Sequence, residues 1–325
     1  MSDLQQPIGS GFGRATTTHE VLTGIDLSGQ LALVTGGYSG IGLAATQAFL
    51  NAGARVIVPA RRPEIAEQAL AGAGDVEVEA LDLADQASVA AFAERFLASG
   101  RSLDIVVASA GIMATPLKRV GPGWEWQFAT NHLGHFALVN RLWPALAAEG
   151  GARVVMVSSS AHRVAGVRWD DVQCTSGEYD KWAAYGQSKT ANALFALHLD
   201  RLGAGAGVRA FSVHPGVTGT DLQRHIPIAE QVAMGWANED GTPAHPEMMK
   251  SPEQGAATGV WAATSPMLEG AGGAYLEDCE VAQVTDDGRD FSQPGVAPHA
   301  VDADQATRLW RTSAELTAVD AFGGN

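Results

Sequence analysis

The segment WAAYGQSKTANALFALHL, residues 182–199, predicts a helix and carries Tyr185 and Lys189 at positions i and i+4. Residues with this spacing share one helix face, so we expect the phenol and the ammonium to lie side by side. An unperturbed phenol has a pKa of about 10, too high for ready proton exchange at neutral pH. A neighbouring ammonium lowers that pKa, and an oxidised nicotinamide would act in the same direction. The pair therefore predicts a general acid/base that interconverts a carbonyl and an alcohol.

A run of hydroxyl side chains lies upstream of this helix. The segment ARVVMVSSS, residues 152–160, predicts a buried strand that ends in Ser158, Ser159 and Ser160. Catalytic groups of open parallel sheets gather beyond the carboxyl ends of the strands. We therefore expect one of these hydroxyls to meet the substrate oxygen near Tyr185. The residue types alone leave the choice among the three serines open.

Glycines follow the first predicted strand at a spacing typical of a dinucleotide site. Glycine permits a tight turn and close backbone approach, and a helix N-terminus offers free N–H groups to a pyrophosphate. The alternative, a glycine-rich turn without a ligand, is disfavoured because a strand and a helix flank the glycines. The segment LVTGGYSGIG, residues 33–42, therefore predicts nucleotide contacts from Gly36, Tyr38, Ser39, Gly40, Ile41 and Gly42.

The end of the second predicted strand bears on the choice of nucleotide. A carboxylate roughly 20 residues beyond the glycines would bind the ribose 2′-hydroxyl of NAD. Here Ala60 is followed by Arg61 and Arg62, whose guanidinium groups suit a 2′-phosphate. We therefore expect NADP(H), with NAD(H) as the alternative. Asp82 and Leu83, after the third strand, are candidates for the adenine edge, although Asp82 equally suits a helix or turn cap.

Short apolar runs alternate with helical patterns along most of the chain. Six such alternations with continuously apolar strands predict a Rossmann-type α/β fold, a doubly wound parallel sheet of about seven strands with helices on both faces. The predicted strands are residues 31–37, 54–60, 76–83, 103–111, 152–160, 208–216 and 272–278. The predicted helices are residues 41–53, a helix that opens at Pro63, and residues 86–99, 123–148, 182–199, 252–265 and 302–316.

The order of these elements favours one domain, residues 28–315, because no repeat or linker divides the chain. Residues 1–27 are polar and predict an extended arm on the body of the protein, and residues 316–325 are expected to be a C-terminal tail. Residues 221–251 break the alternation and predict a loop and helix that cover the substrate site. Their larger apolar side chains suit a pocket lining and the interior of a small covering helix equally well: Met234, Trp236, Met248 and Met249.

Composition excludes several classes of function. The 325 residues include 36 acidic and 21 basic side chains, a formal net charge of −15. That balance argues against nucleic acid as a partner and against attraction to an anionic membrane. No apolar run approaches the roughly 18 residues of a membrane span, and no signal peptide is evident. Two cysteines, Cys174 and Cys279, indicate a reducing compartment, so we expect a cytoplasmic protein.

The histidines predict no metal site. His132 and His135 lie three residues apart on a predicted helix, but no third ligand accompanies them. We therefore expect packing roles for both and no bound metal. His214, which precedes Pro215, is likewise expected to be structural.

Together these motifs resemble those of the short-chain dehydrogenase/reductase family, in the branch that includes retinol dehydrogenases and WW-domain oxidoreductases. TGGYSGIG matches the family pattern TGxxxGxG, and YGQSK matches YxxxK. NHLGHF and HPGVTGTDL resemble its helix asparagine motif and the loop after its sixth strand. SPMLEGAGGAYLEDC is similar to the C-terminal segment of this branch, so the resemblance covers about residues 25–315.

The resemblance implies a role for each candidate. Tyr185 would donate the proton in reduction and accept it in oxidation, while Lys189 would lower its pKa and hold the nicotinamide ribose. Ser159, selected by strand alternation together with the family pattern, would bind the substrate oxygen. Asn131 would help to hold a water that relays protons from Lys189, unless it is a buried helix cap. Further nucleotide contacts would come from Ala110, Gly111, Pro215, Gly216, Val217, Thr218 and Thr220.

The chain departs from the family pattern in two places: after the fourth strand, and in the number of residues between Ser159 and Tyr185. Where the family usually has NNAG, residues 108–111 are ASAG. The missing amides normally brace the sheet and the adenosine pocket, so their loss bears on local stability and cofactor affinity more than on chemistry. The gap between Ser159 and Tyr185 is longer than the family norm and fits the retinol dehydrogenase branch.

We predict an NADP(H)-dependent oxidoreductase that transfers a hydride between nicotinamide and an alcohol or carbonyl, with a hydrophobic ketone or secondary alcohol favoured. One alternative is a nucleotide-sugar epimerase or dehydratase, which the glycine spacing and the short C-terminal part disfavour. The other is a non-catalytic NADP-binding sensor or scaffold, which would not need the catalytic residues. Family members often pair through two long central helices, so a homodimer or homotetramer is one option. The other is that the arm or the C-terminal helix blocks that pairing.

Overall fold

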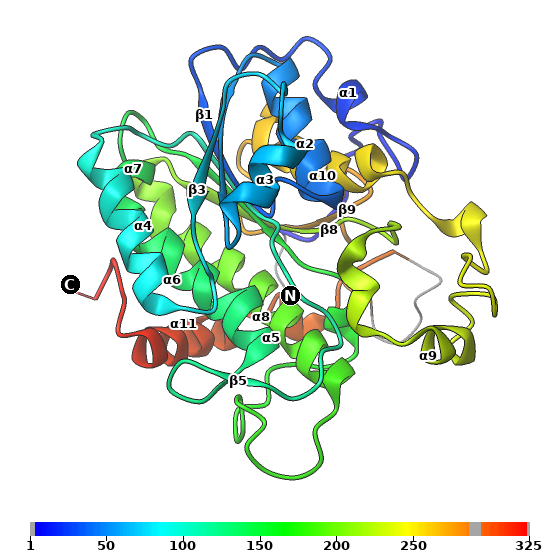
Figure 1. Ribbon diagram of the computed structural model, residues 1–325. Helices are drawn as coiled ribbons and strands as arrows, with labels where there is room; N and C mark the ends of the chain where they lie inside the picture. Colours follow the sequence, from blue (N-terminus) through cyan, green and yellow to red (C-terminus); the bar gives the residue numbers. More distant parts are fainter. Residues whose placement is uncertain (1–3, 286–293, 324–325) are drawn as a thin grey trace.

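The centre of the molecule is a mostly parallel β-sheet. Among the residues that the computed structural model describes, 4–285 and 294–323, eight strands form it in the order β10-β9-β8-β7-β4-β1-β2-β3 (Figure 1). Within it only β10 pairs antiparallel, with β9. The strands are β1 Leu31–Thr35, β2 Arg55–Ala60, β3 Val76–Ala80, β4 Ile105–Ala108, β7 Arg153–Val157, β8 Arg209–His214, β9 Tyr275–Glu277 and β10 Glu280–Val281.

Helices cover both faces of the sheet (Figure 1). One face packs against α1, α2 and α10, and the other against α4, α6 and α8, with α11 outside α8. The α-helices are α1 Thr18–Val21, α2 Gly40–Asn51, α3 Pro63–Ala69, α4 Gln86–Ala98, α5 Trp126–Phe128, α6 Gly134–Arg141, α7 Trp143–Leu146, α8 Lys181–Gly203, α9 Ile228–Ala233, α10 Pro252–Thr264 and α11 Ala303–Thr317. The other turns are the π-helical η1 Ala129–Leu133 and the 3₁₀ turns η2 Ser160–Arg163, η3 Ala204–Ala206, η4 Asp221–His225, η5 Pro246–Met248, η6 Pro266–Leu268 and η7 Pro298–Ala300.

Two apolar cores hold these layers together. Phe49 and Trp261 are fully buried in the core between the sheet, α2 and α10. Phe92, Phe136 and Phe195 are fully buried in the core on the opposite face. Because both faces are covered, the central strands β1, β4 and β7 are mostly apolar along their length, as the sequence predicted, whereas the edge strand β3 alternates with Glu77 and Glu79. The fold class predicted from the sequence is therefore confirmed.

All seven predicted strands are present, and six of them stop short of their predicted carboxyl end, whereas β2 ends at Ala60 as predicted. The residues that follow the strands leave the sheet to form loops at this edge, where the candidate site residues lie. The two-residue β10 is an eighth strand that the sequence did not predict. It follows β9 through a turn in which Asp278 and Cys279 have φ of +53° and +57°.

The predicted helix at residues 123–148 is wrong in its start and its continuity. Residues 119–125 instead form a small hairpin of β5 Arg119–Val120 and β6 Trp124–Glu125. Gly123 has φ +107°, which no helix accommodates, and the Glu125 carboxylate accepts the N–H groups of Gln127 and Phe128 to start α5. The helix is interrupted again by η1 and at the start of α7, where Pro144 lacks an N–H donor.

The N-terminal arm lies on the face formed by α2 and α10. It is not wholly extended, because Thr17 caps the short helix α1. Val21 and Leu27 are buried in the core of that face, and the N–H groups of Ile8 and Ser10 donate to the Glu280 carboxylate. The arm is thereby attached both to the core beside α2 and α10 and to Glu280 of β10.

The C-terminal helix α11 packs across α8. Trp310 stacks on Phe195 with ring centroids 5.5 Å apart and meets Phe136 edge-on at 5.0 Å. Beneath it the Ser313 hydroxyl lies 2.8 Å from Nε2 of the buried His132. The outer face of α6 and α8 is thus covered by α11 of the same chain. No helix among the described residues is both long and apolar enough to cross a membrane.

Candidate active site

The glycine loop forms a narrow cradle between β1 and α2. Gly36 and Gly40 have φ of +68° and +52°, a region that residues with a Cβ rarely adopt. A Cβ at Gly42 would lie 2.3 Å from the carbonyl oxygen of Gly36, so only glycine lets α2 begin this close to the strand. Ser39 precedes α2 without capping it through its side chain. The first N–H groups of the helix therefore point into the loop as anion donors.

The loop after β8 folds back over this cradle. The Thr220 methyl group lies 3.0 Å from the position of a Cβ on Gly40, and Thr218 and Ile41 both meet the position of a Cβ on Gly255. The Thr218 hydroxyl is buried and has no hydrogen-bond partner among the described residues. Since an unpaired buried hydroxyl costs about 1–3 kcal/mol, it is suited to bind a polar group of a ligand.

A small apolar recess opens between the cradle and the carboxyl ends of β4, β7 and β8. Val107, Val157 and Val213 come from these strand ends, and Pro215 and Ile41 come from the two loops. The free helix N-terminus and the unpaired hydroxyl together suit the charged pyrophosphate of a dinucleotide. Pro215 and Thr218 thus lie near Ile41 of the glycine loop, whereas Gly216 lies against the Lys250 side chain and Val217 is 55% exposed.

The residues expected at the adenosine end lie beyond β2 and β3. Arg61 and Arg62 are exposed immediately after β2. The Asp82 carboxylate accepts the Ala84 N–H at 2.9 Å and so shapes a turn, which was the alternative reading of this residue. Leu83 is fixed by α6, because a Cβ at Gly134 would lie 2.2 Å from the Leu83 carbonyl oxygen. Tyr38 is half-buried against the core rather than fully exposed.

Helix α8 presents Tyr185 and Lys189 at the carboxyl edge of the sheet. Asp180 caps this 23-residue helix by accepting the N–H groups of Trp182 and Ala183. The side chains of Tyr185 and Lys189 are both almost fully buried, with the Lys189 Nζ 5.6 Å from the centroid of the phenol ring. The predicted adjacency of phenol and ammonium is therefore present.

The three serines after β7 point in different directions. The Ser159 side chain lies near enough to the Tyr185 hydroxyl for a hydrogen-bonding interaction that lowers the pKa of the phenol, and it also accepts the Ala161 N–H at 3.2 Å. The Ser158 hydroxyl instead donates to the Lys189 carbonyl at 2.8 Å and is buried. Ser160 begins the turn η2. Ser159 is therefore the serine that shares a site with the phenol.

Burial dominates the protonation of this pair. It raises the pKa of Tyr185 to about 12, while the hydrogen bond from Ser159 acts in the opposite direction. It lowers the pKa of Lys189 to about 8. The prediction that the neighbouring ammonium brings the pKa of the phenol below its usual value is therefore wrong for this pair. The reason is that desolvation disfavours both charged forms, and the Lys189 ammonium donates to the Val157 carbonyl at 3.0 Å rather than to the phenol.

Asn131 is fully buried within the π-helical turn η1. Its amide exchanges two hydrogen bonds of 2.9 Å with the backbone of Ile112 and donates to the Ser188 hydroxyl at 3.0 Å. A Cβ at Gly111 would lie 3.3 Å from the Asn131 amide oxygen and 3.7 Å from the Lys189 Nζ. Gly111 therefore keeps open the space between the amide and the ammonium, which the sequence placed in one site.

A second buried contact braces the sheet where the family has asparagines. The Thr35 hydroxyl accepts the Ala110 N–H at 3.0 Å and lies 2.9 Å from Nε2 of His135. Nδ1 of that histidine lies 2.9 Å from the Asn131 carbonyl oxygen. The ASAG segment is thus held by Thr35 and His135, two residues that sequence reasoning did not select. Their separation in the sequence gives no sign of this contact, because Thr35 at the end of β1 and His135 in α6 meet only in the folded protein.

The described residues contain no group of three His, Cys, Asp or Glu side chains that could hold a metal ion. His132 lies among Phe128, Phe136 and Phe195, and burial lowers its pKa to about 3. The pKa of His135 is lowered by burial to about 4. Both rings are therefore neutral packing and hydrogen-bonding groups at neutral pH.

The cradle, the recess and the buried phenol define a dinucleotide-dependent oxidoreductase. A family model described as short chain dehydrogenase matches residues 30–231. The chain is 46% identical over 297 residues to a probable oxidoreductase of Streptomyces lividans, covering 90% of this chain and 98% of that protein. It is 33% identical to human retinol dehydrogenase 14, covering 88% of this chain and 86% of the relative.

Solved structures agree with these matches. A crystal structure of an uncharacterized protein from Mycobacterium paratuberculosis has a TM-score of 0.69 at 32% identity, covering 91% of this chain and 96% of that one. The RhlG/NADP complex from Pseudomonas aeruginosa has a TM-score of 0.59 at 28% identity, covering 78% and 95%. The chain belongs to the short-chain dehydrogenase/reductase family, in its retinol dehydrogenase-like branch, and it is an oxidoreductase of the kind that binds NAD(P) and acts on CH–OH groups.

Replacing Gly42 by alanine should abolish tight nucleotide binding. Its Cβ would lie 2.3 Å from one backbone atom and 2.9 Å from another, and backbone atoms cannot move aside as a side chain can. We expect the dissociation constant for NADPH, measured by fluorescence titration, to rise by more than about tenfold. Gly205→Ala, where nothing lies within 4 Å of the added Cβ, is the control and should bind normally. Normal binding by Gly42→Ala would show that the nucleotide does not use this loop.

The buried Lys189 should give stability an alkaline dependence. Because burial lowers the pKa of the folded state to about 8, the unfolded chain binds more protons above that pH. The free energy of unfolding should therefore rise between about pH 8 and 10, by at most about 1.4 kcal/mol per pH unit. The difference between wild type and Lys189→Met, measured by denaturant unfolding without nucleotide, isolates this contribution. Equal pH slopes for the two proteins would contradict the lowered pKa.

Proposed function

We propose that the protein is an NADP(H)-dependent oxidoreductase that interconverts a hydrophobic ketone and its secondary alcohol, with Tyr185 as the general acid/base. When bound, the nicotinamide supplies or accepts the hydride. The observation that carries the proposal is that Ser159 interacts with the Tyr185 hydroxyl and lowers its pKa, with Lys189 one helical turn further along α8. A substrate oxygen that met both hydroxyls would receive a proton from one and a hydrogen bond from the other.

The direction of the proton follows from the environment of the phenol. In reduction, the neutral Tyr185 favoured by burial is the form needed to donate a proton to the substrate oxygen. In oxidation, the phenolate must form, and the Ser159 hydrogen bond and the Lys189 ammonium are the groups of this chain that favour it. Asn131 and Lys189 meet at Gly111, which supports their expected role in exchanging protons with solvent through a held water.

The preference for NADP(H) is supported by the end of β2. Arg61 and Arg62 are exposed there, and no carboxylate takes the position that would bind a ribose 2′-hydroxyl. The solved RhlG structure from Pseudomonas aeruginosa, at 28% identity, is a complex with NADP. Two guanidinium groups offer a planar set of donors that match a phosphate monoester.

The preference for an apolar substrate is supported by the surroundings of the phenol. Residues from the loop after β4, the start of α8 and the segment 221–226 close around it. Trp182 is in turn in edge contact with Trp236, at 5.4 Å between ring centroids. The apolar cluster contains Met113, Ala114, Tyr185 and Ile226, with Ala161, Trp182 and Leu222 packed against it.

Tyr185→Phe should lower turnover by several orders of magnitude while NADPH binding stays nearly intact, because only the proton-transferring hydroxyl is lost. Turnover is measured by NADPH consumption across a panel of hydrophobic ketones. Tyr179→Phe is the matched control, since its hydroxyl donates to Glu125 at 2.8 Å, away from the Ser159–Tyr185 pair. Unchanged turnover in Tyr185→Phe would remove this residue from its role. Tight NADPH binding without turnover of any ketone by wild type would favour a non-catalytic sensor.

Arg61→Ala together with Arg62→Ala should shift cofactor choice towards NADH. Loss of charge-assisted hydrogen bonds to a 2′-phosphate should lower kcat/KM with NADPH by roughly tenfold to a hundredfold, with little change for NADH. Arg55→Ala is the control, because Arg55 begins the same strand and pairs with Asp75 and Glu77 instead. A wild type that prefers NADH would overturn the assignment of NADP.

A further inference from the structure

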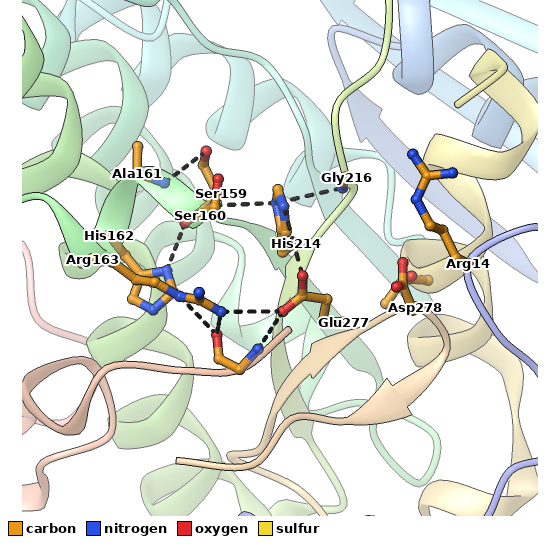
Figure 2. Close-up of polar contacts among 12 residues, drawn as sticks. Arg14, Ser159, Ser160, Ala161, His162, Arg163, His214, Gly216, Glu277 and Asp278 are labelled. Carbon is orange, nitrogen blue, oxygen red and sulfur yellow. Dashed lines mark hydrogen bonds and ion pairs between the residues drawn. The ribbon is translucent and has the colours of Figure 1, made fainter. Parts of the chain in front are cut away.

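A group of buried polar side chains lies behind Ser159, between the ends of β7, β8 and β9, and the mechanism above uses none of them. Figure 2 shows two of these side chains, His162 and His214, at the backbone of Ser159 and Ser160. Buried polar groups are costly unless each is satisfied, so such a group calls for a specific role. Its members are His162, Arg163, His214, Tyr275 and Glu277.

His162 holds the carbonyl end of the peptide group between Ser159 and Ser160. Its Nε2 accepts the N–H of Ala297 at 3.0 Å, so the proton of the neutral ring is on Nδ1. Nδ1 lies 2.6 Å from the Ser159 carbonyl oxygen and donates to it. Burial lowers the pKa of this imidazole to about 3, which keeps the ring neutral and the tautomer defined.

His214 holds the other end of the same peptide group, with the opposite tautomer. Its Nδ1 accepts the N–H of Ser160 at 3.2 Å and that of Gly216 at 3.4 Å, so the proton is on Nε2. Nε2 faces the Glu277 carboxylate, 3.9 Å away. Burial lowers the pKa of this ring too to about 3.

We propose that His162 and His214 are positioning residues that clamp the Ser159–Ser160 peptide group and thereby aim the Ser159 hydroxyl at Tyr185. One imidazole donates to the carbonyl and the other accepts from the N–H, so the peptide plane is held at both ends. A fixed peptide plane restricts rotation of the Ser159 backbone. Because only the Cβ atom separates the hydroxyl from that backbone, the position of the hydroxyl is restricted as well. Because His214 also accepts the Gly216 N–H, one ring links the serine to the loop that faces the glycine cradle.

The two tautomers are set by contacts from the C-terminal part of the chain. Glu277 faces His214, and its carboxylate accepts the Gly295 N–H at 2.9 Å. The Arg163 guanidinium donates to the Gly295 carbonyl and lies 3.8 Å from Glu277 (Figure 2). Ala297, two residues further on, supplies the N–H that fixes His162. Nδ1 faces the peptide in both rings, and Ala297 and Glu277 therefore set which nitrogen of His162 and of His214 carries the proton.

Asparagine and glutamine substitutions separate positioning from packing. Asn places a polar atom where Nδ1 lies and can serve as donor or acceptor, whereas Gln places it near Nε2 and removes the side-chain contact with the peptide. We expect His162→Gln and His214→Gln to lower kcat by about tenfold or more, since small misplacements of reacting groups have such effects. His162→Asn and His214→Asn should stay within about threefold of wild type. Thermal unfolding of all four variants reports the loss of packing.

His132→Gln is the control for a buried histidine that is remote from Ser159. It should lower the melting temperature through its lost contact with Ser313 and leave kcat unchanged. A kcat that tracks melting temperature in every variant, or equal kcat for the Asn and Gln variants, would overturn the clamp.

A double-substitution cycle tests whether His162 acts through Ser159. In the Ser159→Ala background, His162→Gln should cause no further loss of kcat, because the hydroxyl that it positions is absent. Additive losses would contradict the proposal. The inference rests on the proposed function, yet the two fail differently. Wild-type turnover that is lost in Tyr185→Phe, together with additive losses in this cycle, would reject the clamp alone.

Discussion

The burial of a phenol and an ammonium one helical turn apart is the interaction on which the rest of the active site depends. Desolvation drives both groups towards their neutral forms, raising the pKa of Tyr185 to about 12 and lowering that of Lys189 to about 8. The pair can exchange a proton at neutral pH only if neighbouring groups oppose that cost. Ser159 opposes it at the phenol, and the Val157 carbonyl accepts from the ammonium. An oxidised nicotinamide, when bound, would lower the pKa of the phenol further.

These neighbours all come from strand ends, so the parallel sheet is what makes the site possible. β7 delivers Val157 and Ser159, β8 delivers His214 and the loop that covers the glycines, and β1 delivers the glycine loop itself. The apolar cores on both faces hold the strands in register. Their carboxyl ends therefore converge within hydrogen-bonding distance of α8.

The C-terminal third of the chain contributes indirectly. Glu277 and the segment around Gly295 contact the histidines behind Ser159, and the arm is fastened to Glu280 beside them. On the opposite side α11 covers α8 with Trp310 and Ser313. This covering supports the second option for assembly, in which the chain's own helix occupies the face that the central helices would use for pairing.

The sequence alone determined the fold class, the positions of seven strands along the chain, the glycine loop and the Tyr185–Lys189 pair. These features follow from local spacing: apolar period, glycine intervals and an i, i+4 separation are properties of neighbouring residues. The start of the helix after the fourth strand was wrong, because the buried Glu125 and the hairpin before it override the apolar pattern. Only the tertiary structure decided how burial outweighs the ammonium and which residues brace ASAG. Hydrogen bonds such as those of Thr35 with His135, or of His162 with Ala297, join residues far apart in the chain. Their directions depend on how the layers pack, and no interval in the sequence encodes that.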